Sequence, residues 1–176
     1  VIRILKSLGI EAIQVSKASE LGKHRFLVTS GEIFHTDREQ AFSWIRRGGR
    51  ALILGQKEDI EELPLRLNRF SNTRSHLIAP THPIMKGLSQ SDFSYWGDDH
   101  WIAHSSYSKP LDGSFQVLCE TGDELGLGLT PLVEVDEGRG SILYCSLLVA
   151  EKLAQQPVAA RLLENILMWG ALPLRP

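Results

Sequence analysis

The sequence predicts a three-layer α/β domain, with a mostly parallel, doubly wound sheet and an appended antiparallel hairpin. Residues 25–30 (RFLVTS) and 50–54 (RALIL) are largely apolar, as strands buried on both faces of a parallel sheet are. A helical pattern lies between them and completes a βαβ unit, and such crossovers favour an open, doubly wound sheet. Residues 130–149 contain two strand-like runs joined by DEGRG, a turn typical of a hairpin.

The chain begins with apolar residues at positions 1, 4, 5 and 8, which share one helical face and predict a helix that ends at Gly9. No capping residue and no initiator Met precede this helix. We therefore expect residues 1–176 to be one domain cut from a larger multidomain protein. A short strand is expected next, over residues 11–15 (EAIQV).

The helix before residues 50–54 has a start signal and a stop signal. Thr36 and Glu39 have the spacing of a capping box, and Gly48-Gly49 ends the pattern. Its apolar face is formed by Ala41, Phe42, Trp44 and Ile45. Residues 58–70 begin with a helical pattern that Pro64 interrupts.

Residues 76–80 (HLIAP) predict a short strand, and residues 81–101 predict a long ordered loop, which is often functional. Within that loop, Ser89 and Asp92 can cap one helical turn. A further strand is expected over 114–121. The last helix is expected to start near Pro157 and to stop at Gly170 and Pro173.

The composition limits the classes of partner. The net charge is −2 with 43% apolar and 23% charged residues, and no apolar run reaches the length of a transmembrane helix. We therefore expect no nucleic-acid partner and no membrane partner. Cys119 and Cys145 lie in apolar runs and are expected to be buried free thiols. The GxG in ELGLGLTP (124–131) is not completed to a dinucleotide motif, so no cofactor is expected.

The turn after residues 50–54 raises the main question about activity. In many α/β hydrolases and amidotransferases a strand–turn–helix of this kind carries a nucleophilic Cys or Ser. Here the turn offers Gly55, Gln56 and Lys57, and none of them is a suitable nucleophile. Ser30 and Glu32 follow an expected parallel strand, where open α/β sheets bind ligands. We interpret Ser30 as an ordinary loop serine and Glu32 as a candidate ligand residue.

The segment DDHWIAH (98–104) resembles a metal-binding cluster, because His100 and His104 share one face of an extended chain next to Asp98 and Asp99. The pattern also fits a polar surface loop, and we expect no metal site.

Aromatic residues gather in the same loop, where we single out Tyr95, Trp96 and Trp101. Such rings can stack on sugars, fill the space beneath a loop, or contact another domain or subunit. These three alternatives stay open at this point.

Several segments together resemble a known family. They are LVTSGEIF, FSWIRRGGRALILGQ, HPIMKGLSQSDFSYWGDD, TPLVEVDEGRGSILYCSLLV and ARLLENILMWG, which span most of the chain. The chain resembles the class I glutamine amidotransferase-like, flavodoxin-like domain, and more narrowly its non-catalytic form in family 2 bacterial glycoside hydrolases such as β-galactosidases. The resemblance implies a catalytic Cys at Gly55 or Gln56 and a His with an acid after residues 141–146. Leu147 to Ala150 follow instead, so the resemblance carries over the fold and not the activity.

The resulting expectation is a non-catalytic accessory domain of a bacterial glycoside hydrolase. Its expected partners are other domains of the same chain, a second copy of the chain, or a carbohydrate. The alternatives are a hydrolase with an atypical nucleophile or a metal site, and a carbohydrate-binding module.

Overall fold

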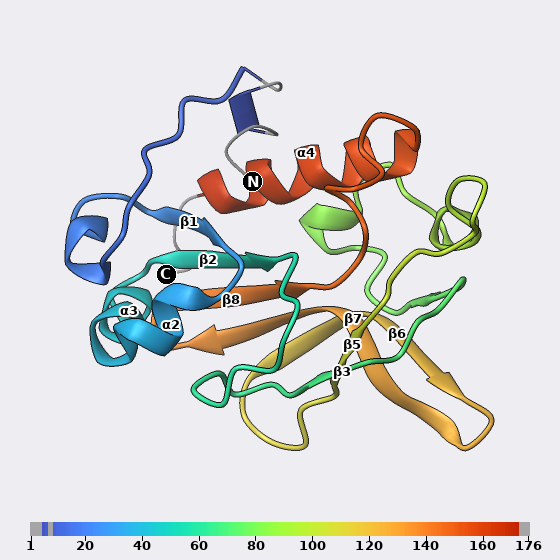
Figure 1. Ribbon diagram of the computed structural model, residues 1–176, viewed down its shortest axis with the longest axis horizontal. Helices are drawn as coiled ribbons and strands as arrows, with labels where there is room; N and C mark the ends of the chain where they lie inside the picture. The colour runs from blue at the N-terminus through green and yellow to red at the C-terminus, as the bar shows by residue number, and fades with distance from the viewer. Residues whose placement is uncertain (1–4, 7–8, 173–176) are drawn as a thin grey trace.

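A mixed eight-stranded sheet runs through the molecule (Figure 1). This computed structural model describes residues 5, 6 and 9–172. The strand order is β1-β2-β8-β7-β5-β3, with β6 joining β4 to β7. One part of the sheet is parallel and the other part antiparallel, and β8 lies between them.

The parallel part consists of β1 (Phe26–Thr29), β2 (Arg50–Leu54) and β8 (Gly140–Cys145). Both pairs, β1 with β2 and β2 with β8, run parallel. The predicted strands at 25–30 and 50–54 are therefore confirmed, and so is the parallel pairing between them.

Helices cover both faces of the parallel part (Figure 1). Successive side chains of a strand point to opposite faces. In β2, Ala51 and Ile53 pack in the cluster that includes Ile45 of α3 (Arg38–Arg46). Leu52 and Leu54 belong to the cluster formed with α4 (Pro157–Ala171). The expected three layers are thus present.

The antiparallel part is built on β7 (Gly126–Glu137), which pairs with β8, β6 (Phe115–Asp123) and β5 (Ser106–Ser108). Two short strands complete it: β3 (Leu67–Asn68) pairs with β5, and β4 (His76–Leu77) pairs with β6. The strands around DEGRG were expected to form an appendage. They are instead an integral part of the sheet, because β8 pairs with β2 along its other edge.

Three sequence expectations differ from the structure. Residues 11–15 form no strand, because no neighbouring strand provides the hydrogen bonds. Residues 58–63 form no helix, because the Asp59 carboxylate accepts a hydrogen bond from the backbone N–H of Leu67 and so holds a loop. Thr36 is no N-cap: it lies inside α2 (Glu32–Thr36), and its hydroxyl donates to the Glu32 carbonyl at 3.1 Å.

The remaining elements are short 3-10 turns and the last helix. The turns are η1 (Ala18–Leu21), η2 (Pro83–Met85) and η3 (Gln90–Phe93). Ser89 and Asp92 form the predicted capping box of η3. The helix α4 begins at Pro157, as predicted, but Gly170 lies inside it. A Cβ on Gly170 would lie 2.6 Å from the ring of Phe26, so this glycine permits close contact with β1.

The expected helix over residues 1–8 lies mostly outside the described residues, within which Leu5 and Lys6 are helical. None of the described helices combines the length and the apolar character needed to cross a membrane.

Candidate functional site

The carboxyl ends of β1, β2 and β8 meet at one edge of the sheet, where open α/β folds bind ligands. The turn after β2 lies at this edge. Gly55 has a φ of 70°, a left-handed conformation that favours glycine. The next residue, Gln56, has only 6% of its surface exposed. The turn therefore aims an almost fully buried amide into the fold.

Both ends of the Gln56 amide are occupied by hydrogen bonds. Its Nε2 donates to the Glu58 carbonyl at 2.8 Å, and its Oε1 accepts from the Tyr107 hydroxyl at 3.1 Å. Burial raises the pKa of Tyr107, so the hydroxyl keeps its proton and remains a donor. Gln56 therefore ties the turn to β5 and has no atom that could attack a carbonyl.

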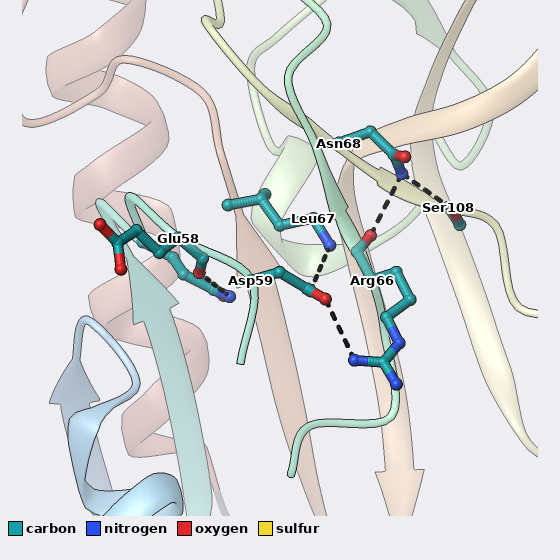
Figure 2. Close-up of polar contacts among 7 residues, drawn as sticks. Glu58, Asp59, Arg66, Leu67, Asn68 and Ser108 are labelled. Atoms are coloured by element: carbon teal, nitrogen blue, oxygen red, sulfur yellow. Dashed lines mark hydrogen bonds and ion pairs between the residues drawn. The ribbon is translucent and has the colours of Figure 1, made fainter. Parts of the chain in front are cut away.

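The loop after this turn is also fixed by side-chain hydrogen bonds (Figure 2). The Asp59 carboxylate accepts from the Leu67 backbone N–H at 2.8 Å and from the Arg66 guanidinium at 3.0 Å. Asn68 Nδ2 donates to Ser108 Oγ at 2.8 Å across the β3–β5 pair. The loop is thus a structural connection from β2 to the antiparallel part of the sheet.

The two thiols do not supply a nucleophile. Cys119 and Cys145 are both fully buried, as the sequence predicts, and both are free. Burial raises the pKa of Cys145 to about 12 and that of Cys119 well above its usual value. Because the thiolate is the reactive form, both groups are inert near neutral pH.

Ser30 and Glu32 lie together at the end of β1. Ser30 Oγ donates to the Glu32 carboxylate, 2.6 Å from each oxygen. Between them, Gly31 has a φ of 113°, which turns the chain into α2. A lone carboxylate is too weak a base to activate a seryl hydroxyl as a nucleophile. The pair can instead form hydrogen bonds with hydroxyl groups of a ligand.

The aromatic residues of the 93–104 segment have different environments. Trp96 is fully buried, and its Nε1 donates to the Asp92 carbonyl at 2.7 Å. Its ring belongs to the cluster beneath α4, so it has no face available for a sugar or a partner. Tyr95 and Trp101 are 53% and 37% exposed. Of the three alternatives for this loop, Trp96 fills space, and the other two rings form a surface.

Lys152 holds this surface in place from the segment after β8. Its buried ammonium donates to the carbonyl oxygens of Trp96 at 2.6 Å and of Trp101 at 2.7 Å. It also pairs with the Asp99 carboxylate. The hydrogen bond from Lys152 lowers the pKa of Asp99. Three acceptors around one cation fix the path of the loop.

The exposed rings are flanked by basic side chains. The Arg74 guanidinium lies 5.5 Å from the centre of the Tyr95 ring, and the ring of His100 contacts Tyr95 edge-on at 5.8 Å. The Trp101 ring lies 6.0 Å from that of His104. Tyr95 and His100 both have positive φ angles, 55° and 63°, which are costly for residues other than glycine. We call these five residues the aromatic surface.

Among the residues that the structure describes, no group of three or more His, Cys, Asp or Glu side chains is placed to hold a metal ion. His100, His104 and Asp98 are exposed, and Asp99 is already paired with the Lys152 ammonium. A cation at Asp99 would be repelled by this neighbouring positive charge.

Sequence reasoning missed a buried hydrogen-bonded contact between His82 of the 81–101 loop and Glu134 of β7. His82 Nε2 lies 2.9 Å from the Glu134 carboxylate, and both side chains are 3% exposed. Because His82 Nδ1 accepts from the Ile84 backbone N–H, its proton lies on Nε2. A glutamate inside the apolar run PLVEV was the available signal for Glu134. No sequence pattern distinguishes Lys152 from a surface lysine.

The comparisons with known proteins concern the fold. No family model matches the chain, and no curated protein matches it. Among solved structures, a cytoplasmic protein from Salmonella typhimurium, STM3548, is 12% identical with a TM-score of 0.61, and the match covers 99% of this chain and 86% of that one. A putative ThuA-like protein from Bacteroides uniformis is 14% identical with a TM-score of 0.59, over 96% of this chain and 82% of that one.

A β-galactosidase from Rahnella sp. R3 also matches, at 16% identity and a TM-score of 0.59. This chain is covered over 97% of its length, whereas only 26% of the β-galactosidase is matched. These similarities show that the chain shares the α/β fold of these proteins, and that fold is compatible with a flavodoxin-like arrangement. At these identities they show the fold alone.

Proposed function

We propose that the chain is a non-catalytic accessory domain of a bacterial glycoside hydrolase, which acts by packing against other domains or subunits. The observation that carries the proposal is Gln56. At the turn where the resemblance implies a catalytic cysteine, it is buried and hydrogen-bonded at both ends of its amide. A side chain used in this way stabilises the fold and performs no covalent chemistry.

The match to the Rahnella β-galactosidase supports the proposal that the chain is one domain of a glycoside hydrolase. It covers nearly all of this chain but about a quarter of that protein, so this fold occurs there as one part of a longer glycoside hydrolase. The aromatic surface supplies a contact region. Exposed Tyr95 and Trp101 are typical of protein interfaces, and Lys152 keeps their loop in one arrangement.

The absence of catalysis is tested on the chain itself, with glutamine and with nitrophenyl glycosides as substrates. We expect no turnover above a heat-denatured control. Ser30 and Glu32 are the polar pair at the candidate site, so Ser30→Ala and Glu32→Gln are the informative variants. Turnover that either variant abolishes would refute the proposal.

The contact role is tested in the parent protein with Tyr95→Ala/Trp101→Ala. The matched control is Leu111→Ala/Leu125→Ala, which removes apolar side chains that are 100% and 91% exposed elsewhere on the domain. We expect the aromatic variant alone to change the oligomeric mass by light scattering, or the KM for the glycoside. If both variants behave like the wild type, the aromatic surface is not the contact.

A carbohydrate-binding module is the second candidate, because Trp101 combines an exposed ring with neighbouring polar groups. Titration with galactose would then change Trp fluorescence in the wild type and not in Trp101→Ala. No change in the wild type excludes this candidate for galactose.

A further inference from the structure

The aromatic surface carries a positive charge that no described acid neutralises. Arg74 is exposed. Among the described residues, its guanidinium lies against the Tyr95 ring, 5.5 Å from the ring centre, and forms no ion pair or hydrogen bond. The N–H donors of this planar group are therefore available to a ligand. A carboxylate matches this fork of donors, because it can accept two parallel hydrogen bonds from it.

A negatively charged group lies in the same segment of the chain as the exposed rings. Asp98 is exposed and has no ion-pair partner in the described part of the chain, whereas Asp99 is paired with Lys152. The Asp98 carboxylate can therefore accept hydrogen bonds from hydroxyl groups of a ligand. It also repels a ligand that presents several carboxylates close together, as an acidic protein segment does.

The exposed rings of Tyr95 and Trp101 supply an apolar contact in this segment, which is the yellow-green loop at the right of Figure 1. His100 packs edge-on against the Tyr95 ring and directly precedes Trp101. Ring surface therefore continues from the guanidinium of Arg74 to Trp101. The apolar C–H face of a sugar ring can pack against aromatic rings of this kind.

The loop keeps this arrangement without a ligand. Among the described residues, Tyr95 and His100 are the two non-glycine residues with a positive φ, 55° and 63°. Such strain persists where the surrounding structure imposes it, and it often occurs at binding sites. Here the Tyr95 N–H donates to the Thr73 carbonyl at 2.8 Å, and Lys152 donates to the Trp101 carbonyl at 2.7 Å. Binding of a ligand therefore requires little ordering of the loop.

We propose that the aromatic surface binds an acidic sugar, a pyranose that carries a carboxylate. Arg74 binds the carboxylate, Asp98 accepts hydrogen bonds from hydroxyl groups, and the rings of Tyr95 and Trp101 pack against the sugar. One ligand of this class satisfies all three features of the surface. The proposal narrows the carbohydrate-binding candidate to acidic sugars. It does not depend on the accessory role, because the chain can bind a sugar whether or not it packs against another domain.

The test compares two sugars that differ only at C6, where galacturonate has a carboxylate and galactose has a hydroxymethyl group. Both are titrated into the chain and followed by calorimetry. We expect galacturonate to bind about tenfold more tightly, because a hydrogen bond to a charged group is stronger than one between neutral groups. Added NaCl should reduce this difference, since it screens exposed charges. Acetate, a carboxylate without a ring, should bind more weakly than galacturonate.

Variants assign the carboxylate contact to one side chain. Arg74→Gln should lower the affinity for galacturonate about tenfold and leave that for galactose unchanged. Arg74→Lys keeps the charge but loses the fork of donors, so its affinity should lie between those of Arg74→Gln and the wild type. The matched control is Arg69→Gln, because Arg69 is also exposed and forms no ion pair within the described chain, but is not part of the aromatic surface. It should bind both sugars like the wild type.

The proposal is overturned if galacturonate does not bind, if both sugars bind equally, or if acetate binds as tightly as galacturonate. Equal losses in Arg74→Gln and Arg69→Gln would also overturn it. A glutamate-rich peptide serves as a further probe. If this peptide binds through Arg74 and galacturonate does not, the surface takes an acidic protein segment, and the acidic-sugar assignment is wrong. None of these results decides the accessory role, which is tested separately in the parent protein.

Discussion

Trp96 and Trp101 lie in the same loop but differ in what they do for the molecule. Trp96 is fully buried against α4, whereas Trp101 keeps 37% of its surface exposed. The sequence shows that both are aromatic and near each other, but not which ring the fold encloses. That choice depends on the path of the loop, which the buried ammonium of Lys152 sets.

Replacement of each tryptophan by alanine distinguishes the two roles. Trp96→Ala leaves a cavity in the core and should lower the free energy of unfolding by about 3–5 kcal/mol. Trp101→Ala removes a mostly surface contact and should change it by about 1 kcal/mol or less. Urea unfolding followed by circular dichroism measures both values. Similar losses would contradict the assignment of Trp96 to the core and Trp101 to the surface.

At the level of elements, close backbone contacts join α3 to β8. A Cβ on Gly140 would lie 2.0 Å from the Gly49 carbonyl oxygen and 2.3 Å from that of Ile45. Backbone atoms cannot rotate away, so the end of α3 would have to move. Gly128 in β7 has open space around its Cα and a φ outside the left-handed region.

This difference predicts opposite results for two identical substitutions. Gly140→Ala should destabilise the protein by about 3 kcal/mol, because it overpacks a junction of two elements. Gly128→Ala should be neutral or stabilise by about 0.5 kcal/mol, because alanine loses less backbone entropy in a strand. Thermal unfolding of both variants measures the difference. Equal melting temperatures would show that α3 and β8 can separate freely.

The ion pair between Lys152 and Asp99 predicts that the stability of the protein depends on pH. The hydrogen bond from Lys152 lowers the pKa of Asp99 in the folded state. The stability that this carboxylate contributes is therefore complete above its usual pKa of about 4, and it is lost as the pH falls through the lower folded-state value. Asp99→Asn should lower the free energy of unfolding at pH 7. In acid, the free energies of unfolding of the variant and the wild type should become more similar. A difference that stays constant with pH would contradict this linkage.

At the scale of the whole molecule, β2 and β8 contribute to both apolar clusters. Leu52 and Leu143 face α4, while Ile53 and Tyr144 face α3. Neither cluster can be lost without disrupting the strands that support the other. We therefore expect a single cooperative unfolding transition.

Intrinsic fluorescence tests this expectation, since Trp44 reports on the α3 side and Trp169 on the α4 side. Two variants, one with Trp44 and the other with Trp169 as the single tryptophan left of the four in the chain, should each show the same urea midpoint by fluorescence and by circular dichroism. Midpoints that separate between fluorescence and circular dichroism would indicate two independent units.

The sequence predicted the parallel part well and the connections less well. Within the apolar runs at 25–30 and 50–54, Phe26–Thr29 and Arg50–Leu54 become strands because each residue pairs with a neighbouring strand. Residues 11–15 have a residue pattern that is equally typical of a strand. A strand also needs a neighbouring strand to pair with, and the local pattern does not show whether one is present. At the candidate site, too, the residue types could be predicted from the sequence and their contacts could not. The sequence alone shows that neither Gly55 nor Gln56 is a nucleophile. The hydrogen bond from Tyr107 to Gln56 could not be predicted, because only the fold brings these two residues together.

The position of β8 has a consequence for synthesis of the protein. Its parallel partner β2 is made first, yet Leu52 meets Leu143, and Ile53 meets Tyr144, only after the residues between the two strands, 55–139, have been synthesised. During that interval the apolar edge of β2 stays open, and such edges associate with other chains. A nascent chain of this fold therefore depends on chaperones, or on rapid translation of residues 55–139, more than a protein with local strand pairing does.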